Sequence, residues 1–146
     1  MWAFYCYDDG QSPDIWRRWL FQDRDVSKSI QARHDVVIGM LRQQDVWNDG
    51  DLVHGLPVDG LVEIVLLVKK DLQWRIAGMY GPKRREFTVL GFFYHKGSQY
   101  RPKGILSEIE SRRDEVRKSN FRKATRCEPP SREEKNAGTS RQRVSR

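Results

Sequence analysis

The sequence predicts an α+β domain with the order β-α-α-β-β-β-α, in which a small, mostly antiparallel sheet carries helices on one face. Three observations lead to this class. An aromatic, β-prone run at 2–7 precedes two helical patterns. Three apolar or alternating runs then follow one another between turn residues. A last helical pattern begins after Pro102-Lys103-Gly104. The 146 residues suffice for one such domain.

The N-terminal half supplies one strand and two helices. Residues 2–7 predict the strand. Ser12-Pro13-Asp14 predicts a helix start, with Ser12 as N-cap and Pro13 at the first helical position. A second helix is expected over 26–44, and its buried stripe would consist of Ile30, Val37, Met40 and Leu41. Residues 47–60 are rich in Gly and Pro and predict a loop.

The C-terminal half supplies three strands and a helix. Strands are expected over 60–70, 72–80 and 86–95, and a helix over 105–118. In the last strand, Phe87, Val89 and Phe93 would share one face, and Leu90, Phe92 and Tyr94 the other. The helix would pack through Ile105, Ile109 and Val116 and keep Glu108, Arg112 and Arg113 in solvent. We expect a domain over 1–119 and a basic, disordered tail over 120–146.

The basic charge is segregated along the chain, whose net charge is +7. Residues 1–64 carry six Lys/Arg against eleven Asp/Glu, whereas residues 65–103 carry nine against two. Such segregation is typical of a surface that binds polyanions, although a basic patch can also serve solubility alone. The central basic segment also contains Trp74, Tyr80, Tyr94 and Tyr100, aromatic side chains on which unpaired bases can stack.

Several other classes of site find no support in the sequence. Three histidines and two distant cysteines, Cys6 and Cys127, have no metal-ligand spacing, so we expect no metal and no cofactor. The cysteines are expected to be two free thiols in a reducing cytosol. Asp8-Asp9 is interpreted as a turn. The longest apolar run, 61–68, is too short to span a membrane, and the N-terminus lacks a signal-peptide pattern, so a cytoplasmic location is expected.

An ordered set of motifs resembles a known family. Gly60-Leu61-Val62-Glu63-Ile64, then Trp74-Arg75-Ile76, then the run 91–97 (GFFYHKG) resemble the phage-derived branch of RelE/HigB-type toxins of type II toxin–antitoxin systems. The resemblance covers about residues 2–118. It implies a RelE-like fold and a metal-independent mRNA endoribonuclease (an mRNA interferase). The partners it implies are mRNA, the ribosome and a cognate antitoxin, often a helix-turn-helix repressor.

The resemblance also assigns roles to residues of the basic segment. Arg75 matches a strand arginine that clamps phosphate, and His95-Lys96 stands where the family has a Lys-Lys pair. Catalytic roles are therefore expected for Arg75, Tyr94, His95 and Lys96. RNA or phosphate binding is expected for Lys69, Lys70, Arg84, Arg85, Tyr100 and Lys103. Two positions depart from the family pattern: Val65 replaces a strand arginine, and Ile109 replaces a small residue.

Three functional hypotheses follow. The first is an RNA-cleaving toxin that uses attack of a 2′-hydroxyl on the adjacent phosphate. The second is a non-catalytic RNA- or ribosome-binding homologue, a decayed toxin, which Val65 and the basic tail favour. The third is a small protein whose basic face binds only a protein partner, because the same charges would attract an acidic segment.

Overall fold

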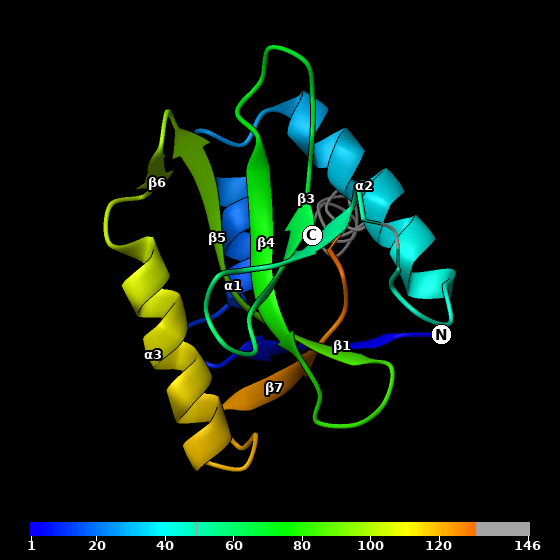
Figure 1. The fold of residues 1–146 in the computed structure, drawn as a ribbon, viewed down its shortest axis with the longest axis vertical. Coiled ribbons are helices and arrows are strands. Elements are labelled where there is room, and N and C mark those ends of the chain that lie inside the picture. The colour runs from blue at the N-terminus through cyan, green and yellow to red at the C-terminus, as the bar shows by residue number, and fades with distance from the viewer. Residues whose placement is uncertain (49, 131–146) are drawn as a thin grey trace, which may run out of the picture.

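The computed structural model describes residues 1–48 and 50–130, and its N-terminal part follows the predicted pattern (Figure 1). Strand β1 spans Ala3–Tyr7, and helices α1 and α2 span Ile15–Gln22 and Lys28–Gln43. The start of α1 differs from the prediction. Its N-cap is Asp14, whose carboxylate accepts from the Arg17 amide at 3.0 Å, rather than Ser12. An aspartate cap also places negative charge at the helix N-terminus.

The remaining elements complete a mixed, mostly antiparallel sheet. They are β2 (Val53–Gly55), β3 (Val62–Val65), β4 (Trp74–Tyr80), β5 (Glu86–Lys96), β6 (Gln99–Arg101), α3 (Ile105–Lys118) and β7 (Ala124–Cys127). In the described residues the strand order is β2-β3-β4-β5-β1-β7, with β6 on β5. Only the β1–β5 pair among these is parallel. The predicted α+β class and mostly antiparallel sheet are confirmed.

Three predicted boundaries are wrong. The strand expected over 60–70 ends at Val65, and Lys69 and Lys70 lie in a turn. The loop expected over 47–60 contains β2, and β6 was not predicted. The tail expected from residue 120 contains β7, which pairs antiparallel with β1. Residues 131–146 of the predicted tail lie outside the described residues.

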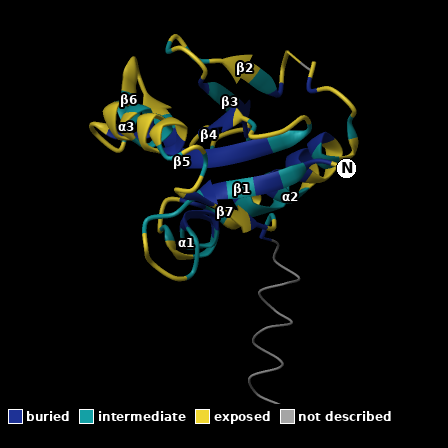
Figure 2. Cartoon of the chain, turned by 90° about the horizontal axis from the view of Figure 1, so that it is seen from below, coloured by how far each residue is buried: buried dark blue, intermediate teal, exposed yellow. Residues whose placement is uncertain are grey.

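The helices cover both faces of the sheet, so the prediction of helices on one face is wrong. One core cluster joins α1 and α2 to residues such as Phe4, Ile76 and Phe87. A second cluster joins α3 to Ala77, Leu90 and other residues on the opposite face. Figure 2 shows the buried central strands between α3 on one side and α1 and α2 on the other. The sheet is therefore the middle layer of three.

A β-bulge in β5 explains why its two faces differ from the prediction. Ala77 pairs with Gly91 but Gly78 pairs with Val89, so Leu90 is an extra residue between them. The alternation of side chains shifts by one position there. Consequently Phe92 and Tyr94 join Phe87 and Val89 on the α1–α2 side, whereas Phe93 joins Leu90 on the α3 side.

The helices confirm most of the predicted packing residues. Ile30, Val37 and Leu41 of α2 are buried, but Met40 is 47% exposed and His34 occupies the core at 1% exposure. Helix α3 has the predicted bounds and buries Ile105, Ile109 and Val116. Arg112 and Arg113 were expected in solvent, yet each is mostly covered. Their guanidinium groups donate to the carbonyl oxygens of Leu90 and Asp59, at 2.8 and 2.5 Å.

Candidate functional site at one end of the sheet

The strand register divides the basic segment between two ends of the sheet. Trp74 pairs with Tyr94 at one end of the β4–β5 ladder, and Tyr80 pairs with Phe87 at the other. Six residues of strand separate these ends by about 20 Å. Arg75, His95 and Lys96 lie at the first end, where the β3–β4 loop and the β5–β6 turn also lie (Figure 1). The turn between β4 and β5 carries Arg84 and Arg85 at the second end.

Arg75 lies on the α3 face of β4 and is anchored by its neighbours. Its Nε atom is 3.7 Å from Oε2 of Glu63 on β3, and both side chains are about seven-eighths buried. Nη1 donates to the backbone carbonyl of Gln73 at 2.9 Å. A guanidinium carries five N–H donors, so Nη2 adds two donors suited to a phosphate oxygen. These contacts hold the arginine in one orientation on the sheet.

His95 and Tyr100 lie next to Arg75 on the same face. Arg75 pairs with Phe93, and His95 is two residues further along β5, which is a diagonal cross-strand neighbour. His95 pairs with Tyr100 of β6, and their ring centroids are 4.6 Å apart. The Phe93 ring packs against both: its centroid is 5.7 Å from that of His95 and 5.1 Å from that of Tyr100. His95 is exposed and Tyr100 is partly exposed, so a ligand can reach both.

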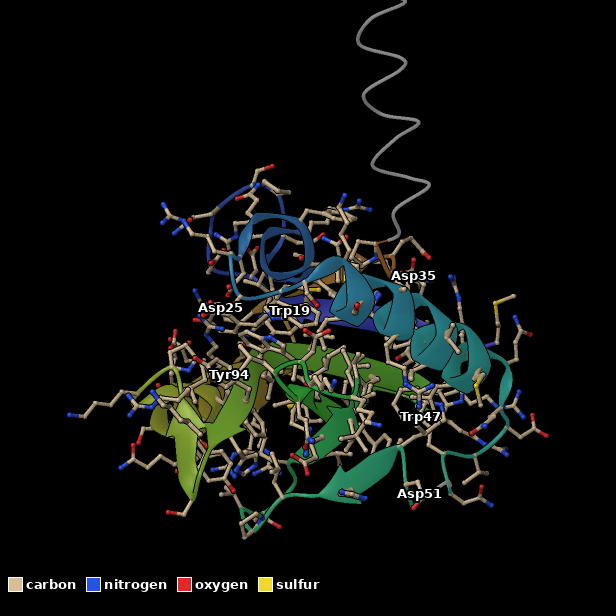
Figure 3. All side chains as sticks on the ribbon, turned by 90° about the horizontal axis from the view of Figure 1, so that it is seen from above. Trp19, Asp25, Asp35, Trp47, Asp51 and Tyr94 are labelled. Atoms are coloured by element: carbon tan, nitrogen blue, oxygen red, sulfur yellow. The ribbon has the colours of Figure 1, made fainter. Side chains whose placement is uncertain are left out.

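Tyr94 and Lys96 alternate with His95 and therefore belong to the opposite face. The Tyr94 ring packs against Trp74 at 4.8 Å in the α1–α2 core. Figure 3 shows Tyr94 near Trp19 and Asp25, on the side of the sheet that α1 covers. The four residues predicted to be catalytic are thus divided: Arg75 and His95 share one face, and Tyr94 and Lys96 do not lie on it.

The predicted phosphate-binding residues also separate into groups. Lys69 and Lys70 are exposed in the β3–β4 loop, and Lys103 is exposed between β6 and α3. The β3–β4 loop lies at the end of the sheet that carries Arg75, and β6, which precedes Lys103, pairs with β5 at the same end. Arg84 is exposed at the other end, and Arg85 forms a salt bridge with Asp45 at 2.6 Å. Arg84 and Arg85 therefore cannot contact the same phosphate group as Arg75.

Val65 lies directly opposite Arg75 in the β3–β4 ladder and is 2% exposed. A second arginine at that position would stand beside Arg75. The β3–β4 ladder therefore contains a single arginine, Arg75. Lys69 and Lys70 lie beyond the end of β3, so they do not occupy the position of Val65.

Glu63 and His54 are two residues of this face that the sequence reasoning did not select. Glu63 Oε1 is 3.4 Å from Nδ1 of His54 on β2, so Glu63 lies between a histidine and Arg75. The isolated carboxylate within the apolar run 61–68 was the available signal. A charge placed within a buried strand needs a partner, and Arg75 supplies it.

A separate polar pocket of about 550 Å³ lies between the β1–α1 loop and α3. Tyr7 donates a hydrogen bond to Glu115, and this bond raises the pKa of Tyr7 above its ordinary value. The Arg112 guanidinium lies 4.9 Å from the centroid of the Tyr7 ring. No residue predicted to be catalytic or phosphate-binding lines this pocket. Among its charged lining residues, Glu108 and Arg112 form an ion pair with each other.

A comparison of the chain with models of protein families finds no match, and comparisons with curated proteins and with solved structures find none either. In residues 1–48 and 50–130, no group of three or more His, Cys, Asp and Glu side chains has an arrangement that could hold a metal ion. The helices of this described part include none with the length and apolar character of a membrane span.

Proposed function

We propose that the chain is a metal-independent endoribonuclease of the toxin class, in which Arg75, His95 and Tyr100 are the working groups. The observation that carries this proposal is their common face at one end of the sheet. Exposed lysines lie in the adjoining loops, Lys69 and Lys70 before β4 and Lys103 after β6. A strand of RNA would be attracted by the lysines and could stack a base on Tyr100.

The proposed chemistry begins with attack of a ribose 2′-hydroxyl on the adjacent phosphorus. His95 accepts the hydroxyl proton, and Arg75 stabilises the negative charge that develops on the phosphate oxygens. The bond from phosphorus to the 5′-oxygen then breaks, and that oxygen takes a proton from Tyr100. The products are a 2′,3′-cyclic phosphate and a 5′-hydroxyl end. Glu63 does not react in this scheme; it positions Arg75 through the ion pair on β3.

Purified protein tests the scheme on an oligoribonucleotide, free and bound to ribosomes, in the presence of EDTA. We expect cleavage that persists in EDTA and leaves cyclic phosphate ends. Substituting 2′-deoxyribose at the scissile nucleotide should abolish cleavage at that position, because the nucleophile is then missing. Cleavage that continues at the deoxy position, or that stops in EDTA, would contradict the mechanism.

The two tyrosines at this end of the sheet provide a matched pair of variants. Tyr100→Phe should lower the cleavage rate by about 10²-fold, since it removes the proposed acid. Tyr94→Phe should leave the rate unchanged, because Tyr94 packs in the α1–α2 core. Equal effects of the two substitutions would exclude Tyr100 as the acid.

A second candidate function is RNA or ribosome binding without cleavage. The valine at position 65 favours it, because a single arginine in the β3–β4 ladder, already paired with Glu63, gives weaker stabilisation of a transition state. In this case the affinity of the protein for RNA would depend on salt, and Arg75→Ala would reduce it, while the wild-type protein would leave RNA intact. A cytoplasmic location and an antitoxin partner belong to the first proposal. Failure to sediment with ribosomes at low salt would instead favour a purely protein-binding face.

A further inference from the structure

The two cysteines lie together in the folded chain, although 120 residues separate them in the sequence. Strand β7 pairs antiparallel with β1, with Cys127 opposite Phe4 and Thr125 opposite Cys6. Cys6 and Cys127 are therefore diagonal neighbours on one face of the sheet. Both belong to the α1–α2 core cluster, and Cys6 is fully buried while Cys127 is 6% exposed.

The strand register and the shared core cluster place the two thiols close to each other. Burial in the core, and then the neighbouring Cys127 side chain, raise the pKa of the Cys6 thiol far above its ordinary value. Cys6 therefore stays protonated and unreactive while β7 remains paired with β1. Diagonal partners in an antiparallel ladder lie about 7–8 Å apart, slightly beyond the usual span of a disulfide, so a bridge between these thiols needs a small movement of β7 as well as side-chain rotation.

We propose that Cys6 and Cys127 form a site of oxidative modification, at which a peroxide converts the thiol pair into an intramolecular disulfide that joins β1 to β7. This inference is independent of the proposed ribonuclease activity, because the pair lies in the core between the sheet and α1, away from Arg75, His95 and Tyr100.

Access to the pair is expected through β7. This strand has four residues, lies at the edge of the sheet and pairs only with β1 among the described strands. Short edge elements open locally at a smaller free-energy cost than unfolding of the whole domain. Opening of β7 exposes Cys127 first, because Cys127 lies on the moving strand and Cys6 on the inner one. Cys127 is thus the residue that meets the oxidant, and Cys6 is the resolving thiol.

The reaction balances in two steps. The Cys127 thiolate attacks one peroxide oxygen, the O–O bond breaks, and a sulfenic acid and one water form after proton uptake. The Cys6 sulfur then attacks the Cys127 sulfur, the S–O bond breaks, and a second water leaves with the Cys6 proton. Together the two thiols lose two electrons, and these reduce one hydrogen peroxide to two waters. The bridge keeps β7 on the sheet.

Native full-length protein treated with hydrogen peroxide tests the proposal. We expect an intact mass lower by two hydrogens, loss of both titratable thiols, and a non-reducing peptide map in which the two cysteine peptides are joined. Dithiothreitol should reverse all three changes. Thiols that survive peroxide, sulfinic acid at Cys127 without a bridge, or a disulfide between two chains would overturn the proposal.

Two single variants test the order of the steps. In Cys6→Ser the sulfenic acid at Cys127 has no resolving thiol, so dimedone should label Cys127 during oxidation. In Cys127→Ser the remaining thiol is fully buried, and we expect no labelling of Cys6. Labelling of Cys6 alone would overturn the assigned order. Circular dichroism establishes that each variant is folded. The peroxide test on the wild-type protein does not depend on either variant.

Discussion

At the scale of single residues, His34 shows how the core constrains a titratable group. The Trp16 indole donates to His34 Nε2 at 2.9 Å, so Nε2 carries no proton. The proton of the neutral ring is then on Nδ1, which donates to Asp35 at 3.0 Å. Burial in the core lowers the pKa of His34 below its ordinary value, although Asp35 opposes this shift. Protonation of Nε2 would break the bond from Trp16.

The stability of the protein should therefore fall in mild acid. Below about pH 6.5 the unfolded chain binds a proton at His34 that the folded chain does not. The free energy of unfolding should then decrease by up to about 1.4 kcal/mol per pH unit, until the lowered folded pKa is reached. His34→Gln keeps an acceptor for Trp16 and a donor for Asp35 but does not titrate. Urea unfolding between about pH 7 and pH 5 should show a shallower slope for this variant. An equal pH dependence of the unfolding free energy for wild type and His34→Gln would contradict the assignment of this effect to His34.

The residue types of the proposed site could be predicted from the sequence, but their grouping could not. Arg75 and His95 stood out because cations and a histidine in a carboxylate-poor segment suit phosphate chemistry. Tyr94 and Lys96 stood out for the same reason, and strand alternation assigns them to the other face. Glu63 was missed because its significance depends on Arg75, which is a neighbour only across two paired strands.

At the scale of elements, the fit between β5 and α3 depends on Gly91. A methyl group at this position would lie 2.9 Å from Ile109 Cγ1 and 3.3 Å from its Cδ1. Ile109 thus occupies the space that a side chain on the strand would fill. This pairing gives a structural reason for a large residue at 109.

Gly91→Ala should accordingly destabilise the protein by about 1–3 kcal/mol through overpacking. The destabilisation by Gly91→Ala should be smaller when Ile109 is also replaced by alanine. A double-mutant cycle, in which urea unfolding gives the stability of each variant, measures this interaction energy. Gly39→Ala is the matched control: it lies within α2, nothing is within 4 Å of its added methyl, and it should stabilise by up to about 1 kcal/mol. Additive effects of the Gly91 and Ile109 substitutions would contradict the packing argument.

Element prediction succeeded where the pattern was long and local. Helix α3 and strand β5 have the expected bounds, give or take one residue, because amphipathic periodicity and turn residues define them. Strands β2, β6 and β7 were missed because each has three or four residues and owes its conformation to pairing with another strand. Polar residues within β7 also made it look like part of a tail.

At the scale of the whole molecule, β7 makes residues beyond 119 part of the fold. Its Ala124 and Cys127 are buried, and the carbonyl of Lys123 accepts from the Asp8 amide at 2.8 Å. A chain ending at Ser119 should lose roughly 3 kcal/mol of stability or fail to fold, because it exposes the edge of β1 and part of the core. A chain ending at Pro130 retains every described element and is the control. Equal thermal unfolding of the two chains would contradict this role of β7.

The three-layer arrangement was not predictable from local patterns. The sequence shows that both α3 and the α1–α2 pair are amphipathic, but not which face of the sheet each covers. The bulge at Leu90 also shifts the strand alternation, so the apolar pattern of β5 cannot be divided correctly by counting every second residue. The consequence for function is that α3 and the candidate site share one face of the sheet.

The most direct test of the central claim compares two cations at the same end of the sheet. Single-turnover cleavage of ribosome-bound RNA is measured for wild type, Arg75→Ala and Lys96→Ala. Arg75→Ala should slow cleavage by about 10²–10³-fold, because it removes the group that stabilises the reacting phosphate. Lys96→Ala should weaken binding slightly and leave the rate at saturating RNA within about threefold, since its strand position faces away from Arg75. Equal losses for the two variants, or no cleavage by wild type, would contradict the account.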